Sequence, residues 1–326
     1  MFPRSTPAVI SGFRLFWRCL LFSLSVALHG ATVSSPRHAV LAVDRGNLAR
    51  FDATGKATWV QRGIPDAHCV QPLPNGNVLV QDSWTRVIEL NPSGEIVWSY
   101  DCATMNGNAG KKIETHSFTR LDNGLTMIAE CGRARIIEVD QAGKIHHEVK
   151  LAVNPPDFHR DTRRVQKLPN GNYLVAHEGE GRVTEYAPDS AVVWDYAVPL
   201  FDRERLSVPN HGAQGWGNMV SNAIRLKNGN TLIATGNGHS VIEVTPGKEI
   251  VWHLKQYDLP GIELNWMKHL EELPNGNFII GNCYAAGANP QLIEVNRAKE
   301  VVWTFADHEV LGHAVSAVIT LGEANR

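Results

Sequence analysis

The sequence has few of the features that define several common protein classes. Its five cysteines include no Cys-x-x-Cys motif and no adjacent pair, so a scaffold held together by many disulfides is excluded. The four cysteines beyond the N-terminal segment predict one structural bridge or none, and they are Cys69, Cys102, Cys131 and Cys283. The formal net charge is −2, and no run of Lys and Arg forms a basic stripe. Nucleic acid is therefore not an expected partner.

No apolar run near the N-terminus is long enough to cross a bilayer as a helix, which needs about 20 residues. The apolar run of residues 19–28 follows three arginines, and this order is typical of a secretory signal. We therefore expect residues 1–31 to be a signal peptide and residues 32–326 to form one domain. The mature protein is then exported and has no membrane span after cleavage. A short membrane anchor is the alternative interpretation of the same segment.

One short pattern returns along the chain at intervals of 47 to 58 residues. A leucine is followed by Pro-Asn-Gly-Asn or a close variant and then by apolar residues. The leucines of the five copies are Leu73, Leu121, Leu168, Leu226 and Leu273. Proline fixes φ at about −65°, and Asn and Gly tolerate a left-handed backbone, so each copy predicts a tight turn between two strands. Such a repeat indicates an array of similar β-units.

A second turn motif, usually followed by a tryptophan, alternates with the first. It occurs six times, against five copies of the first motif. The missing first strand is supplied by Ala314–Leu321, whereas Ala39–Gln61 carries only the later strands of a unit. The sequence therefore predicts an all-β fold, a six-bladed β-propeller with four antiparallel strands per blade, closed by the C-terminal strand joining the N-terminal blade. The tryptophans expected to be largely buried between blades are Trp98, Trp194, Trp252 and Trp303.

In a propeller, the connections between blades gather at one end of the ring, and in this chain they are the long and variable ones. The residues just before each innermost strand face this end, as do the ends of the second strands. The candidate catalytic residues at these positions are His68, His116 and His269. The candidate ligand-binding residues are Arg163, Arg164, Asp82, Glu130, His177, Asn222 and Asn282. The loops at the same end add His159, His211, His239, His308 and His313.

These side chains suit more than one chemistry. Histidine acts as a base or a nucleophile, arginine stabilises an oxyanion, and histidines with carboxylates bind metal ions. No His-x-His or His-x-x-x-His spacing supports a metal site, so none is predicted. The alternative is a three-histidine site formed by His68, His116 and His269 from different blades. The sequence identifies no cofactor, and we expect an unidentified small-molecule, carbohydrate or protein ligand.

The turn motifs resemble those of two families of propeller proteins. The segment Phe51-Asp-Ala-Thr-Gly-Lys-Ala-Thr-Trp59 is similar to the blade motif of the dehydrogenases that use pyrroloquinoline quinone. Those enzymes are eight-bladed and hold the quinone with Ca²⁺, usually beside a disulfide between adjacent cysteines. This chain has six predicted blades and no such cysteine pair. The resemblance therefore implies a shared repeat and leaves the quinone open.

The segments that begin at His68 and at Trp266, each ending in Leu-Pro-Asn-Gly-Asn, resemble the propeller of bacterial arylsulfotransferases. The resemblance covers about residues 38–321, and it implies six blades, export and covalent catalysis. In that family one histidine accepts the sulfuryl group while other histidines and an arginine hold its oxygens. The matching positions are His68, His116, His269 and Arg163, whereas Ser221-Asn222 stands where a histidine would be expected. The leading expectation is a ligand-binding propeller, and the alternative is an arylsulfotransferase-like enzyme.

Overall fold

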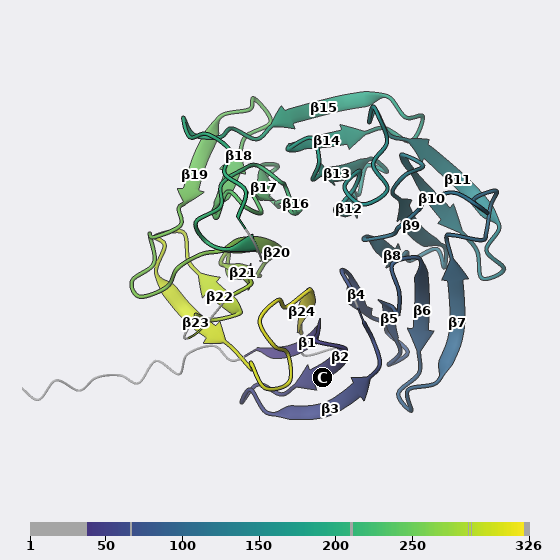
Figure 1. Ribbon diagram of the computed structural model, residues 1–326, viewed down its shortest axis with the longest axis horizontal. Helices are drawn as coiled ribbons and strands as arrows, with labels where there is room; N and C mark the ends of the chain where they lie inside the picture. The colour runs from purple at the N-terminus through teal and green to yellow at the C-terminus, as the bar shows by residue number, and fades with distance from the viewer. Residues whose placement is uncertain (1–37, 66, 209–210, 286, 288, 323–326) are drawn as a thin grey trace, which may run out of the picture. The chain divides into compact units, whose positions relative to one another are not determined.

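The computed structural model describes residues 38–65, 67–208, 211–285, 287 and 289–322. These residues form six antiparallel four-stranded sheets, arranged as blades around a central axis (Figure 1). The expected six-bladed, all-β propeller is thereby confirmed. The predicted signal segment, residues 1–31, lies outside the described residues. No helix in the described part of the chain is long and apolar enough to cross a membrane.

The innermost strand of each blade is named first in the following description. The closing blade and the next contain β24 (Ala317–Leu321), β1 (Ala39–Asp44), β2 (Asn47–Phe51) and β3 (Ala57–Arg62), then β4 (Val70–Pro72), β5 (Val78–Gln81), β6 (Arg86–Leu90) and β7 (Ile96–Asp101). The third and fourth contain β8 (Phe118–Arg120), β9 (Thr126–Glu130), β10 (Arg135–Val139) and β11 (Ile145–Lys150), then β12 (Arg164–Lys167), β13 (Tyr173–His177), β14 (Arg182–Tyr186) and β15 (Val192–Ala197). The last two contain β16 (Asn222–Arg225), β17 (Thr231–Ala234), β18 (Val241–Val244) and β19 (Ile250–Leu254), then β20 (Trp266–Glu272), β21 (Phe278–Cys283), β22 (Leu292–Val295) and β23 (Val301–Phe305).

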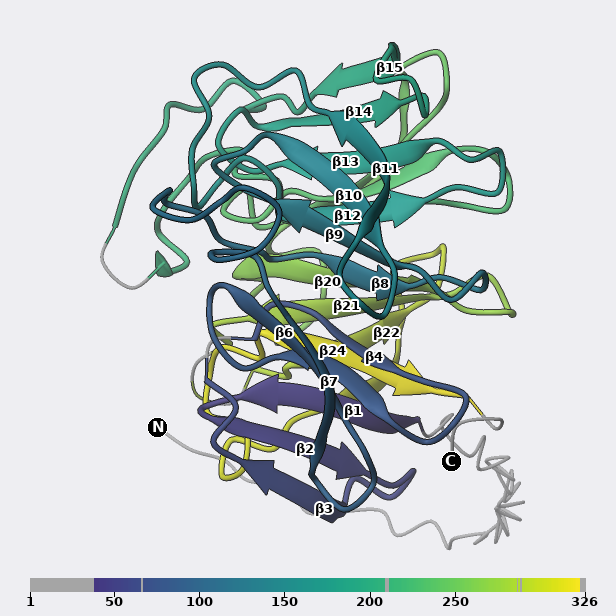
Figure 2. The same ribbon diagram turned by 90° about the vertical axis from the view of Figure 1, so that its right-hand side faces the viewer.

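The ring is closed by β24, which comes from the C-terminal part of the chain and lies beside β1 (Figure 2). The two strands pair antiparallel over five residue pairs, from Ala39–Leu321 to Val43–Ala317. Leu321 and Ala317 pack in a buried cluster with residues of β1, so the pairing is supported by apolar burial as well as by backbone hydrogen bonds. The closure expected from the unequal number of turn motifs is therefore confirmed. It also removes a strand edge that would otherwise be free to pair with another chain.

The Pro-Asn-Gly-Asn motif forms the turn between the first and second strands of a blade. In the first copy, the Leu73 amide donates to the carbonyl oxygen of Asn77 at 2.8 Å. Gly76 has a φ of 85°, a left-handed conformation that a residue with a Cβ adopts only with strain. The same leucine hydrogen bond closes the turns that begin at Leu121, Leu168, Leu226 and Leu273. The motif is thus explained by backbone geometry.

A buried glutamate ties this turn to the neighbouring blade. It stands one residue before the end of the third strand in five blades, at Glu89, Glu138, Glu185, Glu243 and Glu294. Glu185, for example, accepts from Asn172 of its own turn at 2.6 Å and from Arg225 of the next blade at 2.7 Å. The corresponding partners in the other blades are Arg120, Lys167 and Arg297, together with the imidazole of His38. The closing blade has Arg50 at the corresponding position of β2.

The tryptophans of the outermost strands are largely buried between blades, as the sequence predicts. Trp98, Trp194, Trp252 and Trp303 are partly exposed, and each packs against a core cluster formed by residues of two neighbouring blades. Their remaining exposure arises because an outermost strand has one side open to solvent, as the exposed neighbours of these tryptophans show. Each of the first three also donates its indole N–H to a backbone carbonyl of the next blade at 3.0 Å, those of Gln141, Pro246 and Arg297. Their role is contact between blades at the rim.

The sequence predicted one disulfide bridge or none. The four cysteines in the described part of the chain are all free and buried, so they form no bridge. Three of the thiols donate to a backbone carbonyl of the next blade. The pairs are Cys69 with Phe118 at 3.2 Å, Cys131 with Thr162 at 3.2 Å and Cys283 with Ala314 at 3.3 Å. These cysteines therefore act as buried contacts between blades.

Candidate functional site

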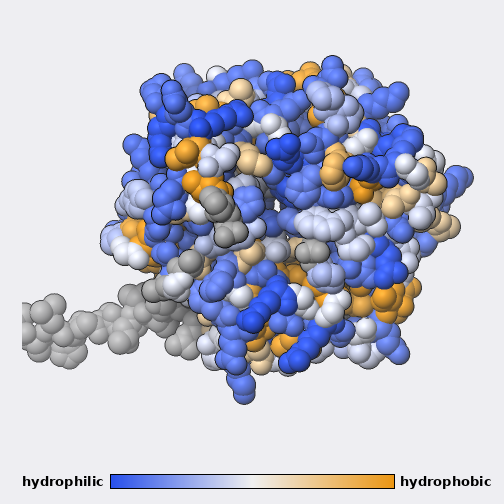
Figure 3. Space-filling model, in the orientation of Figure 1, coloured by the Kyte–Doolittle hydropathy of each residue, from blue (hydrophilic) through white to orange (hydrophobic). Residues whose placement is uncertain are grey.

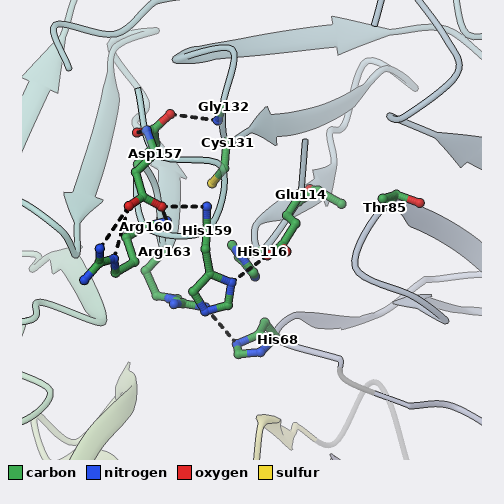
Figure 4. Close-up of polar contacts among 12 residues, drawn as sticks. His68, Thr85, Glu114, His116, Cys131, Gly132, Asp157, His159, Arg160 and Arg163 are labelled. Atoms are coloured by element: carbon green, nitrogen blue, oxygen red, sulfur yellow. Dashed lines mark hydrogen bonds and ion pairs between the residues drawn. The ribbon is translucent and has the colours of Figure 1, made fainter. Parts of the chain in front are cut away.

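Three polar side chains from three different blades meet at one end of the central axis, which we call the mouth. His68 lies two residues before β4, Arg163 lies directly before β12, and Lys268 lies in β20. Lys268 Nζ lies 3.0 Å from His68 Nδ1, and Arg163 Nη1 lies 3.3 Å from the same atom. Figure 4 shows the side chain of Arg163 directed at His68. Two of the predicted residues, His68 and Arg163, are therefore in direct contact.

The two cationic neighbours determine where the proton of His68 lies. The side chains of Arg and Lys donate hydrogen bonds and cannot accept them, so Nδ1 must be the unprotonated ring nitrogen. The proton of the neutral ring is therefore on Nε2. Burial, together with the charges of Lys268 and Arg163, holds the pKa of His68 well below its usual value. At neutral pH His68 is a neutral imidazole whose lone pair faces two cations.

Lys268 reaches this position because of an irregularity in β20. Where β20 pairs with β21, the register shifts so that Lys268 and His269 together oppose the single residue Gly281. Two residues opposite one constitute a β-bulge, which changes the direction of the side chains it contains. A Cβ on Gly281 would lie 2.7 Å from the Cβ of His269, so the bulge depends on a glycine at this position. Burial lowers the pKa of the Lys268 ammonium from its usual value.

The backbone around His68 is held by Gln81, a fully buried residue at the end of β5. Its side-chain oxygen accepts from the His68 amide at 2.7 Å, and its side-chain nitrogen donates to the Thr115 carbonyl oxygen at 2.7 Å. Gln81 therefore fixes two mouth segments relative to each other, the one that carries His68 and the one that carries His116.

A second group of side chains lies beside His68, and we call Glu114, His116 and His159 the histidine–glutamate cluster. His159 Nδ1 lies 2.6 Å from Glu114 Oε2, and His116 Nε2 lies 3.2 Å from the same oxygen. The three side chains point toward one another in Figure 4. The ring centroid of His116 is 4.9 Å from that of His68 and 5.1 Å from that of His159. Trp84 packs against all three imidazole rings.

A cavity of about 480 Å³, the mouth pocket, opens over His68, Arg163 and Lys268. Its volume lies in the range of small-molecule sites. Several aromatic side chains contribute to its wall, namely Trp84, His211, Trp266 and Tyr284. Figure 3, drawn in the same orientation as Figure 1, shows that hydrophilic residues predominate on this face of the propeller. The mouth pocket thus combines cationic groups with an aromatic wall.

A much smaller cavity, of about 20 Å³, lies between the innermost strands and shares His68, Arg163 and Lys268 with the mouth pocket. It has room for about one water molecule. The predicted residues Arg164, Asn222 and His269 line this second cavity. Arg164 donates to Cys69 Sγ at 2.8 Å, and His269 Nε2 lies 2.6 Å from Glu271 Oε1. His269 is therefore placed on the axis but is already paired.

Two predicted carboxylates, Asp82 and Glu130, line neither cavity. Asp82 forms an ion pair with Arg86, four residues further along the chain. Glu130 is buried and accepts from Tyr100 at 3.0 Å and from Arg135 at 2.6 Å. The structure does not bring either carboxylate to His68: Asp82 pairs locally with Arg86, and Glu130 joins its own blade to Tyr100 of the preceding one.

His177 and Asn282 also line neither cavity, although both are buried. His177 Nδ1 donates to the Asp161 carbonyl oxygen at 2.6 Å, and its Nε2 lies 3.0 Å from the Tyr186 hydroxyl. Burial lowers the pKa of His177 to about 4. The side-chain oxygen of Asn282 accepts from the Asn265 amide at 2.7 Å. Both side chains brace loops at the mouth.

Three residues that make up the site were not among the predicted ones, namely Lys268, Glu114 and Trp84. Lys268 stands five residues before Leu273, the same offset that relates His68 to Leu73. The offset therefore points to Lys268, whereas residue type favoured its neighbour His269, which lines the smaller cavity. His159 was expected at this end from its loop, but its partner Glu114 was not, because loops do not repeat from blade to blade.

No family model matches the chain, and no curated protein matches its sequence. Solved structures do match its fold. A protein of unknown function from Bacteroides caccae superposes with a TM-score of 0.70 at 21% sequence identity, covering 89% of this chain and 100% of that one.

Lyases that act on streptogramin antibiotics are among the other similar structures. A streptogramin B lyase has a TM-score of 0.55 at 11% identity and covers 84% of each chain. A catalytically inactive histidine-to-alanine variant of virginiamycin B lyase from Staphylococcus aureus, solved with quinupristin, has a TM-score of 0.53 at 12% identity, covering 82% of this chain and 84% of that one. At these identities the likenesses show the fold alone, a β-propeller.

Proposed function

We propose that the mouth pocket binds a small anionic ligand that carries an aromatic group. The observation that carries this proposal is the lone pair of His68 Nδ1, held between the Lys268 ammonium and the Arg163 guanidinium. Arg163 is already paired with Glu178, whereas Lys268 forms no ion pair with a carboxylate in the part of the chain that the structure describes. The pocket therefore has an uncompensated positive charge next to a neutral imidazole, an arrangement that favours an anion.

The aromatic wall supports the second half of the proposal. Trp266 and Tyr284 line the pocket together with Trp84, and His211 stacks on Tyr284 with ring centroids 5.0 Å apart. Aromatic side chains give large contact areas and prefer offset or edge-to-face packing with another ring. An aryl sulfate combines a fixed negative charge with an aromatic ring, and it is the ligand class that fits both features.

Sulfuryl transfer is the second candidate function, favoured by the unprotonated Nδ1 of His68, which becomes available once a bound anion has drawn Lys268 and Arg163 to itself. In this step Nδ1 attacks the sulfur atom of an aryl sulfate, an N–S bond forms, and the S–O bond to the aryl group breaks. The bonding pair leaves with the aryl oxygen, and the Lys268 ammonium donates a proton to it. Arg163 lies beside the transferred oxygens. The oxygen of a second phenol then attacks the sulfur: an S–O bond forms, the N–S bond breaks with its electron pair returning to Nδ1, and the phenol proton passes to the Lys268 amine, which restores both side chains.

Binding is tested by calorimetry with phenyl sulfate, with phenol as the uncharged control. We expect binding of phenyl sulfate, and a loss of about 10- to 100-fold in affinity for Lys268→Met, since a hydrogen bond to a charged group contributes about 1.5–3 kcal/mol. His313→Ala, which removes an exposed histidine outside the mouth pocket, is the matched control. Equal affinity for phenol and phenyl sulfate would contradict the proposal.

Transfer is tested by incubating the protein with 4-nitrophenyl sulfate and an acceptor phenol. Enzyme activity predicts release of nitrophenol and an added SO₃ group on His68 by peptide mass spectrometry, both lost in His68→Ala. Quinupristin and pyrroloquinoline quinone with Ca²⁺ are the competing ligands to include. Binding of phenyl sulfate without an adduct leaves a binding protein, whereas a spectral change with the quinone alone would favour the dehydrogenase resemblance.

We also propose that the protein is exported, which rests on the arginine-rich and apolar order of residues 1–31 alone. Expression in a bacterial host followed by N-terminal analysis of the secreted material tests it. A mature N-terminus near residue 31 is expected. Full-length protein retained at the inner membrane would instead favour a membrane anchor.

A further inference from the structure

The histidine–glutamate cluster is independent of the contact between His68 and its two cations, and it has the composition of a metal site. Two imidazole nitrogens and one carboxylate oxygen, from Glu114, His116 and His159, all lie within 4.8 Å of one another. Ligand atoms around a tetrahedral zinc ion, each about 2.0–2.1 Å from the metal, are separated by about 3.3 Å. The distance of 3.2 Å from His116 Nε2 to Glu114 Oε2 is already close to that value.

His116 provides a second, separate observation. Its side chain is fully buried, yet neither ring nitrogen forms an aligned hydrogen bond, although the backbone of His159 lies close enough to act on its pKa. The nearby Glu114 oxygen is close enough to Nε2 for an ion pair but is not aligned for a hydrogen bond. His116 is the one residue in the described part of the chain with two such buried nitrogen or oxygen atoms. An unpaired buried polar group costs about 1–3 kcal/mol, so a group of this kind indicates a ligand at the site.

The protonation state of His116 also suits a metal ligand. Burial, together with the charges of Arg163 and His159, holds its pKa well below the usual value, so the ring is neutral. Arg163 and Lys268 are the cations that face the cluster, and the charge of Arg163 is offset by its ion pair with Glu178. Glu114 supplies a carboxylate toward a divalent ion.

We propose that Glu114, His116 and His159 bind one divalent transition-metal ion, of which Zn²⁺ is the best fit, with an open coordination position toward the mouth pocket. Two nitrogen ligands and one oxygen ligand favour Zn²⁺ and its neighbours over Mg²⁺ and Ca²⁺, which take oxygen ligands. His68 Nδ1 is occupied by Lys268 and Arg163, so it is not counted as a ligand. Three protein ligands and one open position are the usual arrangement of catalytic zinc sites.

This set differs from the three-histidine alternative considered from the sequence, because His269 is paired with Glu271. His159 reaches the site from the long loop between β11 and β12, with 40% of its side chain exposed, so the ion has a route from solvent. The proposal does not require an aryl sulfate or a catalytic His68. An ion at this position would add positive charge beside the proposed anion site.

The experiment uses the full chain without a purification tag, freed of metal by dialysis against a chelator. Calorimetry with Zn²⁺ should give one equivalent bound per chain, and Co²⁺ should give the visible absorption of a tetrahedral ion. His159→Ala should weaken binding by more than about 100-fold, because even a change next to a metal ligand costs about 10- to 100-fold. His146→Ala, which removes an exposed histidine of β11 far from the mouth pocket, is the matched control and should bind as the parent does.

Circular dichroism and the melting temperature establish that each variant is folded, and Glu114→Gln is the second variant should His159→Ala fail this check. Bound Zn²⁺ should raise the melting temperature of the parent and leave those two variants unchanged. The proposal is overturned by an absence of stoichiometric Zn²⁺ and Co²⁺ binding, or by binding that survives in both variants. Loss of phenyl sulfate binding alone, with metal binding intact, would overturn only the proposed function.

Discussion

The two ends of the propeller are organised in different ways. At the turn end, five blades repeat the same arrangement, in which a buried glutamate pairs with an Arg, Lys or His side chain of a neighbouring blade. At the mouth, the residues before or within the innermost strands differ from blade to blade, and they are His68, His116, Arg163, Ser221, Lys268 and Ser316. The glutamates at the turn end are all paired, whereas at the mouth His116 has two buried ring nitrogens without an aligned hydrogen bond.

This difference shows how structure and chemistry are divided along the repeat. A glutamate that recurs at the same position in five blades, each time paired with a basic side chain of a neighbouring blade, explains how blades are held together. The polar residues at the mouth differ from blade to blade, so they are not needed to hold the blades together. At these positions His68, Arg163 and Lys268 contact one another. We therefore expect changes at the turn end to alter stability and changes at the mouth to alter binding.

The largest effect is expected from removing β24, on which both ends depend. Deleting residues 312–326 removes all five pairs with β1 and exposes the buried residues packed against it. The ring then opens and its free edges pair between molecules, so we expect aggregation rather than a soluble monomer. Size-exclusion chromatography measures this outcome. A truncation after Gly322, which keeps every pair, is the control, and a soluble, fully stable 312–326 deletion would contradict the closure.

The next effect concerns the glutamates of the turn end. Glu185→Ala leaves Asn172 and Arg225 without their acceptor, and the side chain of Arg225 is only 20% exposed. We expect a loss of about 2–4 kcal/mol in the free energy of unfolding, because a partly buried charge remains unpaired. Urea denaturation is the measurement. Glu180→Ala, at a longer and more exposed ion pair, should cost less than about 0.5 kcal/mol.

The sequence predicted the turn end well because turn geometry is local. The unequal numbers of the two turn motifs establish strand order, blade number and closure without any knowledge of packing. The mouth was predicted only in part. The offset from the turn leucine placed His68, Arg163 and also Lys268, but residue type favoured His269, and only the bulge in β20 shows that Lys268 is the one that reaches His68. Glu114 belongs to a non-repeating loop, so its contact with His159 depends on the tertiary fold.

A smaller effect, which depends on pH, should come from His177, a buried brace of the mouth. Burial lowers its pKa in the folded protein to about 4, against about 6.5 when unfolded. As the pH falls, the unfolded chain therefore takes up a proton at His177 before the folded protein does. The stability that neutral His177 contributes is complete above about pH 6.5 and is lost as the pH falls toward 4. The loss should reach roughly 3 kcal/mol. Urea denaturation at pH 7 and at pH 4.5 measures the free energy of unfolding. Between these two pH values it should decrease less for His177→Gln than for the parent, and equal decreases would contradict this prediction.

The smallest expected change in stability tests whether the bulge controls binding. In Gly281→Ala, the added Cβ would lie 2.7 Å from His269 Cβ and 3.0 Å from its backbone nitrogen, so β20 must shift. Overpacking of this kind costs about 1–3 kcal/mol, and we expect the lower end because a single methyl group is added. Lys268 would then leave His68 Nδ1, so phenyl sulfate affinity should fall by about 10-fold or more.

Gly247→Ala is the control, at a turn where the atom nearest to the added Cβ would be 3.6 Å away, and it should change neither the stability nor the affinity. Calorimetry and urea denaturation of both variants separate the two effects. Normal binding by a destabilised Gly281→Ala would mean that Lys268 keeps its position without the bulge, and that the irregularity in β20 serves packing alone.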